Sequence, residues 1–154
     1  MTLIHMVMTP KIITVPVGTS IQSAQEIMIE KRIRHLPVVD HSQKVIGMLS
    51  QSDMTYLAQT KNVNVEMIMS IPVQSIDENT PVRKAIFTLL EKKISSLLVT
   101  KADGKVAGIV TTDDLLWQLA HLLSEEEFDV SEDFSVREQQ TIGEIANELS
   151  IAGI

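Results

Sequence analysis

The sequence predicts an α+β fold in which two tandem β-α-β-β-α repeats pack with pseudo-two-fold symmetry, followed by a short C-terminal helical extension. The 154-residue chain repeats itself at an offset of 61, so that residues 8–54 align with residues 69–115 without a gap. Twelve of these 47 aligned positions are identical. A regular offset of this length indicates one supersecondary unit used twice. Because a unit of about 60 residues is marginal alone, we expect the two copies to bury their apolar faces against each other.

Three strands are expected in each copy, and a polar turn joins the second strand to the third. The predicted strands are Ile12–Val17, Leu36–Val39 and Val45–Leu49 in the first copy, and Val73–Asp77, Leu97–Thr100 and Val106–Val110 in the second. The second turn contains Asp103-Gly104, which favours a hairpin. A short helix is expected to follow the third strand, beginning near Ser52 and near Asp113.

A longer helix is expected between the first and second strands of each copy, because apolar residues recur there at helical spacing. In the first copy Thr19 and Gln22 fit a capping box. In the second copy we expect Thr80 to cap the helix and Pro81 to occupy its first position. The apolar positions are Ile21, Ala24, Ile27 and Met28 in one helix, and Val82, Ala85, Ile86, Leu89 and Leu90 in the other.

The repeat predicts three regions: a first repeat over residues 1–61, a second over 62–123, and an extension over 124–154. Residues 1–123 hold 12 basic and 11 acidic residues, whereas residues 124–154 hold one and nine, so the extension carries the acidity of the chain. Three capping-box patterns there, and an apolar stripe from Ile142 to Leu149, predict short helices. They would dock on the chain's own body or on a second subunit, or else form an interaction tail for another protein.

Composition excludes several classes of function. The chain has no cysteine, which rules out disulfides, thiolate metal sites and cysteine nucleophiles. No apolar run approaches the length of a membrane span, and no signal peptide is evident, so we expect a cytoplasmic protein without membrane contact. The near-neutral body lacks a basic stripe, which argues against nucleic-acid binding. The four histidines lack metal-ligand spacing, and no metal site is expected.

The strongest local signal follows the third strand of each repeat. It reads Gly47-Met48-Leu49-Ser50-Gln51-Ser52-Asp53 in one copy and Gly108-Ile109-Val110-Thr111-Thr112-Asp113-Asp114 in the other. A hydroxyl where a strand enters a helix can donate to a phosphate, and the helix N-terminus favours anions. An aspartate three residues later can accept both hydroxyls of a ribose. The alternative is that Ser50 and Thr111 only cap helices, with first-turn acids behind them.

With these motifs, residues 8–117 closely resemble the CBS-domain pair, also called the Bateman module. The resemblance includes the starts Met8-Thr9-Pro10 and Met69-Ser70-Ile71-Pro72, the segment Leu36–Asp40, and both Gly-x-x-Ser/Thr-x-x-Asp motifs. It implies a regulatory sensor, not an enzyme, that binds adenine nucleotides such as AMP, ADP or ATP in two clefts between the repeats. The nucleotide would be a regulatory ligand, and no obligatory cofactor is expected.

The resemblance also implies roles for individual residues. Asp53 and Asp114 would hold ribose hydroxyls, and Ser50 and Thr111 would reach the phosphate. The remaining predicted nucleotide-binding residues are Arg32 and Lys93 toward the phosphate, His35 and Ser96 near the base, Thr9 and Ile13 facing the Asp114 site, and Ser70 and Gln74 facing the Asp53 site. Tyr56 and Trp117, equivalent in the repeat, are expected to be core or dimer-interface anchors, with contact to the ligand as the second possibility.

Differences between the copies predict unequal sites. The first copy has Arg34 and His35 where the second has Ser95 and Ser96. Asp113 adds a carboxylate beside the expected phosphate position, a repulsion of about 1 kcal/mol if partly exposed. We therefore expect phosphate-rich ligands to prefer the Asp53 site.

The expected assembly is a stand-alone homodimer that signals in trans to an unidentified protein partner. The alternative is a structural or protein-interaction module with vestigial clefts that acts through its acidic tail.

Overall fold

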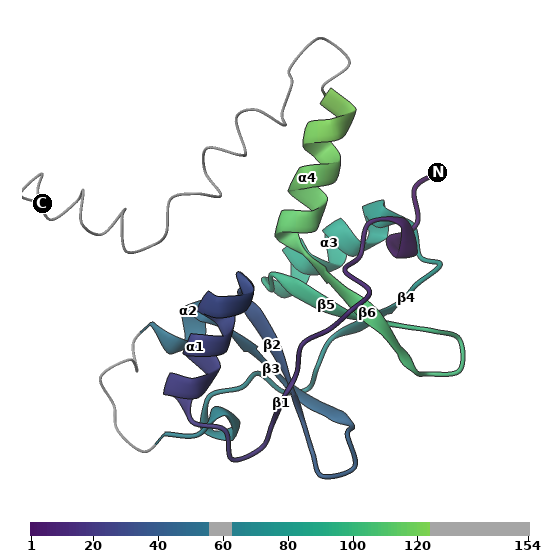
Figure 1. The fold of residues 1–154 in the computed structure, drawn as a ribbon. Helices are drawn as coiled ribbons and strands as arrows, with labels where there is room; N and C mark the ends of the chain where they lie inside the picture. The colour runs from purple at the N-terminus through teal and green to yellow at the C-terminus, as the bar shows by residue number, and fades with distance from the viewer. Residues whose placement is uncertain (56–62, 124–154) are drawn as a thin grey trace, which may run out of the picture. The chain divides into compact units, whose positions relative to one another are not determined.

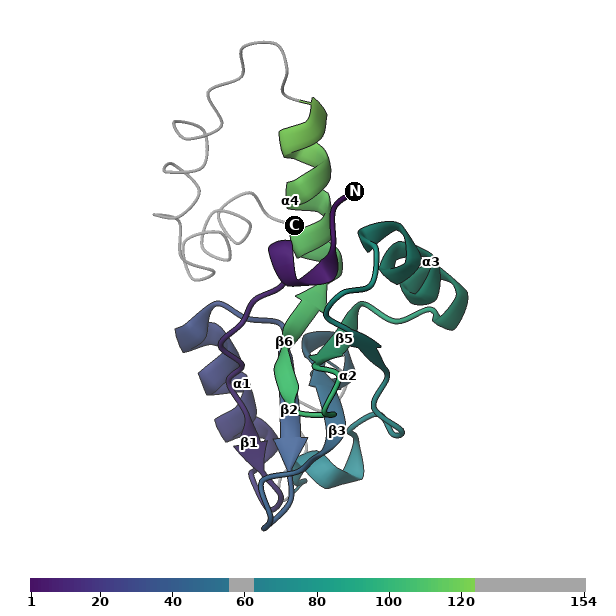
Figure 2. The same ribbon diagram turned by 90° about the vertical axis from the view of Figure 1, so that its right-hand side faces the viewer.

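The computed structural model describes residues 1–55 and 63–123, which form two three-stranded sheets with helices (Figure 1, and Figure 2 for the view turned by 90°). The first sheet has the order β1-β2-β3 and the second β4-β5-β6. In each sheet the first pair of strands is parallel and the second pair antiparallel. The elements are η1 (Ile4–Met6), β1 (Val15–Pro16), α1 (Ile21–Lys31), β2 (His35–Val39), β3 (Val45–Ser50), α2 (Gln51–Met54), η2 (Val65–Met67), β4 (Ser75–Asp77), α3 (Val82–Lys92), β5 (Ser96–Thr100), β6 (Val106–Thr111) and α4 (Thr112–Leu123).

The predicted α+β repeat is confirmed, and it begins earlier than the sequence match. Helices α1 and α3 have eleven residues each and start 61 positions apart. The short 3-10 helices η1 and η2 keep the same offset, although the sequence alignment starts only at Met8. The predicted capping patterns and apolar stripe of residues 124–154, and Tyr56, lie outside the described residues.

The first strand of each repeat is shorter than predicted. Strand β1 covers only Val15–Pro16 of the predicted Ile12–Val17, and β4 covers Ser75–Asp77 of Val73–Asp77. The residues just before each strand line cavities instead of continuing the sheet. Ile12, Ile13, Val73 and Gln74 therefore belong to cavity walls and not to the strands predicted there.

Both predicted helix caps are wrong by one residue. The N-cap of α1 is Ser20, whose Oγ accepts a hydrogen bond from the Ser23 N–H at 3.1 Å. The Thr19 hydroxyl instead donates to the Pro16 carbonyl at 2.7 Å, so it stabilises the preceding turn and does not cap the helix. The N-cap of α3 is Pro81, and no side chain caps that helix.

Backbone from the other repeat caps the first turn of both helices. The Val82 N–H donates to the Thr2 carbonyl and the Ile21 N–H to the Val63 carbonyl, each at 3.0 Å. The two bonds are equivalent under the 61-residue offset. A side-chain cap at Thr80 is thus unnecessary, because a segment distant in sequence accepts the first N–H of α3.

The segments that enter each repeat are exchanged between the two cores. Ile4, at the start of the chain, is fully buried in the cluster that contains Leu97 and Val110 of the second repeat. Val65, its equivalent, is fully buried among the residues of the first repeat, including Leu36. We call residues 2–10 and 63–71 the entry segments. Each repeat therefore completes its core with the entry segment of the other.

The entry segments approach a glycine on the third strand of the opposite repeat. A Cβ added to Gly108 would lie 2.5 Å from the Thr9 carbonyl oxygen and 3.2 Å from Pro10 Cα. Thr9 is held there by bonds to Ile109 in both directions, at 2.8 and 3.0 Å. A Cβ at Gly47 would instead collide with the Met69 side chain, including its flexible thioether end.

Gly108→Ala is therefore expected to destabilise the protein more than Gly47→Ala, although the two glycines are repeat-equivalent. Steric overpacking costs about 1–3 kcal/mol, and we expect the upper part of this range at Gly108, because backbone must move. A methionine can change rotamer at lower cost. Urea unfolding midpoints of the two variants measure the difference, and a larger loss in Gly47→Ala would contradict the described packing of Thr9.

Candidate functional site

Two cavities lie between the repeats, and each contains one Ser/Thr-x-x-Asp motif. The cavity around Asp53, which we call the Asp53 cavity, has a volume of about 640 Å³. The cavity around Asp114, the Asp114 cavity, has about 300 Å³. The Asp53 cavity is lined by His35, Met48, Ser50, Ser52, Asp53, Ser70, Ile71, Pro72, Val73, Gln74, Lys92, Lys93, Ile94, Ser95 and Ser96, and the Asp114 cavity by Thr9, Lys11, Ile12, Ile13, Arg32, Ile33, Arg34, His35, Pro37, Ile109, Thr111, Asp113, Asp114 and Trp117.

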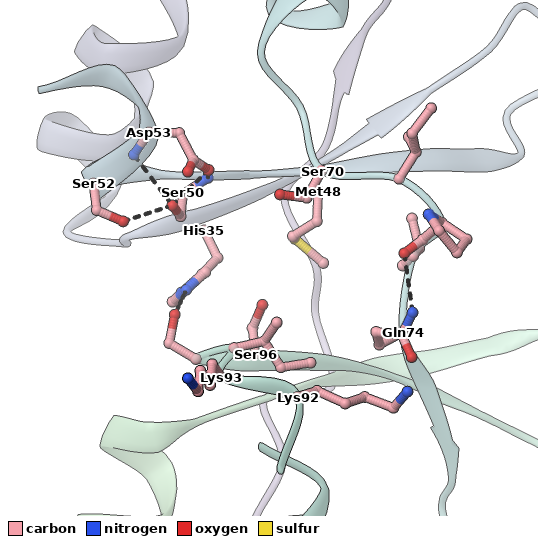
Figure 3. A pocket seen from close by; sticks show the side chains of 15 residues that line it. His35, Met48, Ser50, Ser52, Asp53, Ser70, Gln74, Lys92, Lys93 and Ser96 are labelled. Carbon is pink, nitrogen blue, oxygen red and sulfur yellow. Dashed lines mark hydrogen bonds between the residues drawn. The ribbon is translucent and has the colours of Figure 1, made fainter. Parts of the chain in front are cut away.

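Every residue predicted to bind the ligand lines one of these cavities. Figure 3 shows the Asp53 cavity, with Ser50 and Asp53 on one side and Lys93 and Ser96 on the other. His35, Ser70 and Gln74 complete the predicted set there, and Thr9, Ile13, Arg32, Thr111 and Asp114 lie together in the Asp114 cavity. Whether each residue binds a nucleotide stays a prediction.

The serine and threonine of the motifs cap the helices that follow them. Ser50 is the N-cap of α2, and its Oγ donates to Asp53 Oδ2 at 2.6 Å while its N–H donates to the same oxygen at 2.9 Å. Thr111 makes the equivalent bonds to Asp114 Oδ2, at 2.8 and 2.7 Å. Ser50 and Thr111 therefore cap their helices. These bonds share one carboxylate oxygen and fix each aspartate at its cavity wall, so capping and ligand binding are compatible.

The opposite wall of each cavity comes from the other repeat's entry segment. Ser70 pairs its backbone with Met48, with bonds of 2.8 and 3.1 Å, just as Thr9 pairs with Ile109. The backbone of Thr9 and Ser70 is therefore fixed, and their side chains line the Asp114 and Asp53 cavities respectively.

The basic residues cross from one repeat to the other. Arg32 and Arg34 of the first repeat line the Asp114 cavity, whereas Lys92 and Lys93 of the second repeat line the Asp53 cavity. The expected preference of phosphate-rich ligands for the Asp53 site rested partly on the arginines of the first copy. This argument is wrong, because these arginines line the Asp114 cavity. The turn that ends α1 faces the opposite repeat, so of the two arguments for unequal sites only Asp113 remains.

Arg32 and Lys93 share an unusual backbone conformation. Each is the C-cap of its helix in the left-handed region, with φ of 53° and 54°. Glycine is the usual residue there, because a side chain in this region costs roughly 1–2 kcal/mol. A strained position that carries a cation at a cavity wall is a candidate functional position.

Lys93→Gly is therefore expected to stabilise the protein by about 0.5–1 kcal/mol and to weaken binding of phosphate-bearing ligands. Lys93→Ala is the matched control, since it removes the ammonium group and keeps the left-handed side chain. Urea unfolding and calorimetric titration with AMP separate the two effects. Both variants should lose affinity, and only the glycine variant should gain stability.

His35 lines both cavities. Its side chain is buried, and Nε2 lies 2.8 Å from Ser95 Oγ, which belongs to the Asp53 cavity. Burial lowers the pKa of His35 below its ordinary value, and the adjacent Arg34 lowers it further, while Asp113, Asp53 and Asp114 oppose this shift. The imidazole is thus held neutral where the cavities meet.

The lowered pKa of His35 predicts a loss of stability in acid. A histidine whose pKa is depressed by folding contributes its stability above the unfolded pKa of about 6.5, and this contribution is lost as the pH falls below that value. The thermal midpoint should therefore fall less between pH 7.5 and 5.5 in His35→Ser, which copies Ser96, than in the wild type. His41→Ser, at an exposed turn, is the control and should follow the wild-type curve. A wild-type slope in His35→Ser would contradict the prediction.

The cavities differ at a matched pair of positions that carries an ion pair in one of them. In the Asp114 cavity Arg34 forms an ion pair with Asp113 across the repeats. The equivalent positions in the Asp53 cavity are Ser95 and Ser52, both uncharged.

Some lining residues were not among the predicted ligand contacts. Trp117 is 39% exposed and lines the Asp114 cavity, so it is not a core anchor, and its place fits the second possibility, contact with a ligand. It follows Asp114 by three residues, within one helical turn, and this spacing could have identified it. Lys11 and Lys92 also face the cavities, and only their positive charge marks them in the sequence.

Within residues 1–55 and 63–123, no helix is long and apolar enough to cross a lipid bilayer. In the same part of the chain, no three histidine or acidic side chains gather as metal ligands would.

The family model named CBS domain matches residues 4–59 and again residues 65–121. A homoserine O-acetyltransferase of Methanohalobium evestigatum is 35% identical over 109 residues, which are 71% of this chain and 22% of that protein. The match therefore spans about a fifth of that relative's length.

Two solved structures resemble the fold closely. The CBS domain pair of protein MJ0100, in complex with 5'-methylthioadenosine and S-adenosyl-L-methionine, has a TM-score of 0.72 and 28% identity, covering 79% of this chain and 98% of that one. CBSX2 in complex with AMP has a TM-score of 0.68 and 27% identity, with the same coverage of 79% and 98%; CBSX2 is a protein of Arabidopsis thaliana.

Proposed function

Because this chain belongs to the CBS-domain family, we propose that it is a regulatory sensor that binds adenine nucleotides in the two cavities between its repeats. One observation carries the proposal. Each Ser/Thr-x-x-Asp motif lies in its own cavity, opposite residues of the other repeat. A ligand in either cavity would contact both repeats and change how they pack.

The Asp53 cavity contains residues suited to contact the ribose, the phosphate and the base of a nucleotide. Asp53 presents a carboxylate to ribose hydroxyls, which donate more strongly to a charged acceptor than to a neutral one. Lys92 and Lys93 supply positive charge for the phosphate from the opposite side. Met48 and Ile71 offer apolar surface for the base. Both cavities have volumes of the order found for small-molecule sites, roughly 300–1,000 Å³.

The similar structures support an adenosine-type ligand. These structures are complexes with AMP, or with 5'-methylthioadenosine and S-adenosyl-L-methionine, and all three ligands contain adenine and a ribose diol. The diol is the group that Asp53 and Asp114 would recognise, whereas the 5' substituent differs. We therefore assign recognition of the shared part to the aspartates, and choice of the 5' group to the basic residues.

We assign no catalytic role to the cavities. The acetyltransferase relative matches this chain over 22% of its length only, and its activity is not transferred. Homodimerisation, a protein partner and a cytoplasmic location remain predictions from the sequence.

Thermal shift with AMP, ADP, ATP, 5'-methylthioadenosine and S-adenosyl-L-methionine tests the proposal, because a ligand that binds the native state raises its apparent stability. Adenine and ribose 5-phosphate alone are the controls. A shift with any complete nucleoside ligand that is lost in the Asp53→Ala/Asp114→Ala double variant supports a sensor. No shift with any of them at millimolar concentration would favour the alternative, an interaction module with vestigial clefts.

A further inference from the structure

The Asp114 cavity contains an ion pair that its counterpart lacks. Arg34, before β2, and Asp113, in the first turn of α4, form this pair, and their side chains are 54% and 52% exposed. In the Asp53 cavity the same two positions are Ser95 and Ser52. The substitution is paired, because both charges are absent from one cavity and present in the other.

The ion pair changes what a phosphate chain meets in the Asp114 cavity. Arg34 is already neutralised by Asp113, and a phosphate that approaches Arg34 must displace that carboxylate. Asp113 is also adjacent to Asp114, so a ligand whose ribose is held by Asp114 brings its 5' group close to a second negative charge. The repulsion grows with each added phosphate charge. The smaller volume of this cavity, about 300 Å³, acts in the same direction.

We infer that the Arg34–Asp113 ion pair determines specificity, making the Asp114 cavity select adenosine ligands without an extended phosphate chain and leaving di- and triphosphates to the Asp53 cavity. The inference rests on the proposed function and adds the ligand class of each cavity. Two unequal cavities would let one protein respond to two ligands that share adenosine and differ in charge.

Calorimetric titration of the full chain with AMP and with ATP, in buffer without divalent cations, tests the inference. The parent is Asp53→Ala, so that only the Asp114 cavity keeps its aspartate. Adding Asp113→Ser, which copies Ser52, should raise ATP affinity relative to AMP by about five- to tenfold. Adding Arg34→Ser should shift the ratio the opposite way, because it leaves Asp113 unpaired. General damage to the cavity would not give opposite signs.

A second ion pair provides the control. Asp103 and Lys105 form an exposed pair at 2.8 Å on the β5–β6 turn, outside both cavities. Asp103→Ser should leave the ATP-to-AMP ratio within twofold of the parent. The reciprocal change Ser52→Asp, in the Asp114→Ala background, should lower ATP affinity relative to AMP in the Asp53 cavity.

The outcomes separate the inference from the proposed function. If AMP binds the parent and Asp113→Ser leaves the ratio unchanged, the ion pair does not determine specificity, although the sensor proposal stands. If neither nucleotide binds the wild type or the parent, both are overturned. Asp113→Asn, which keeps the side-chain shape, replaces Asp113→Ser if thermal melting shows that the serine variant is unfolded.

Discussion

Truncating Ile4 to alanine should lower the free energy of unfolding by about 2–5 kcal/mol, the range for large-to-small changes in a protein core. A residue so near the N-terminus would ordinarily tolerate substitution. Ile4 does not, because it is fully buried in the core of the second repeat. Its N–H also donates to the Thr80 carbonyl at 2.9 Å. Because this bond holds the backbone in place, the backbone cannot shift to fill the void that the truncated side chain leaves.

Met6 is the matched control for Ile4. It lies on the same 3-10 helix and is 63% exposed, so Met6→Ala should change stability by less than about 0.5 kcal/mol. Urea unfolding of the two variants measures the difference. If Ile4→Ala were as mild as Met6→Ala, the first entry segment would not be docked in solution. Docking also positions Thr9 at the Asp114 cavity. Ile4→Ala should therefore weaken ligand binding at the Asp114 cavity more than at the Asp53 cavity.

Asp53→Ala should reduce the affinity of the Asp53 cavity for an adenosine ligand by roughly 10- to 100-fold, since hydrogen bonds to charged groups contribute about 1.5–3 kcal/mol each. The same substitution removes the capping box of α2, which costs about 1 kcal/mol of stability. Affinity must therefore be measured by calorimetry well below the melting temperature of the variant.

Two further substitutions separate the charge of Asp53 from its capping role. Asp53→Asn keeps a side-chain oxygen for the Ser50 N–H and removes the charge, so it should retain more stability than alanine while losing most of the affinity. Asp40 accepts bonds from the Ser42 and Lys44 N–H groups on an exposed turn, and it lies outside both cavities. Asp40→Ala should leave affinity unchanged. Full affinity in Asp53→Asn would show that ribose recognition does not depend on the carboxylate.

The repeat in the sequence predicts the elements well, because equivalent residues experience equivalent local forces. The starts of the helices between the first two strands of each repeat were predicted to within one residue, as were the strands of the hairpins. The cap at Thr80 was missed because the Thr2 carbonyl, far away in sequence, accepts the first N–H of α3. The cap of α1 was misplaced because the Thr19 hydroxyl donates to the Pro16 carbonyl, and Ser20 caps the helix instead. Local capping rules assume that a helix start is satisfied by its own neighbours.

The residues of the site could be predicted from the sequence. Which of the two cavities each residue lines could be predicted only in part. An alignment of repeats identifies equivalent residues but does not say which copy each one contacts. Arg32 is 18 positions before Ser50 in the chain, yet it lines the cavity of Thr111. The sequence would be equally periodic if both basic turns faced their own motifs, so only the three-dimensional packing distinguishes the two arrangements.

The exchanged entry segments also bear on how the protein is made. A ribosome adds about 5–20 residues per second, and N-terminal units ordinarily fold first. Here the first repeat lacks Val65 until the second repeat has begun to emerge, and Ile4 has no core to enter until β6 has been synthesised. The side chain of Ile4 therefore stays without its native neighbours until Leu97, Val99 and Val110 have been synthesised. Neither core can be completed by the residues of its own repeat, so each half of the protein reaches its native packing only when the other half is present.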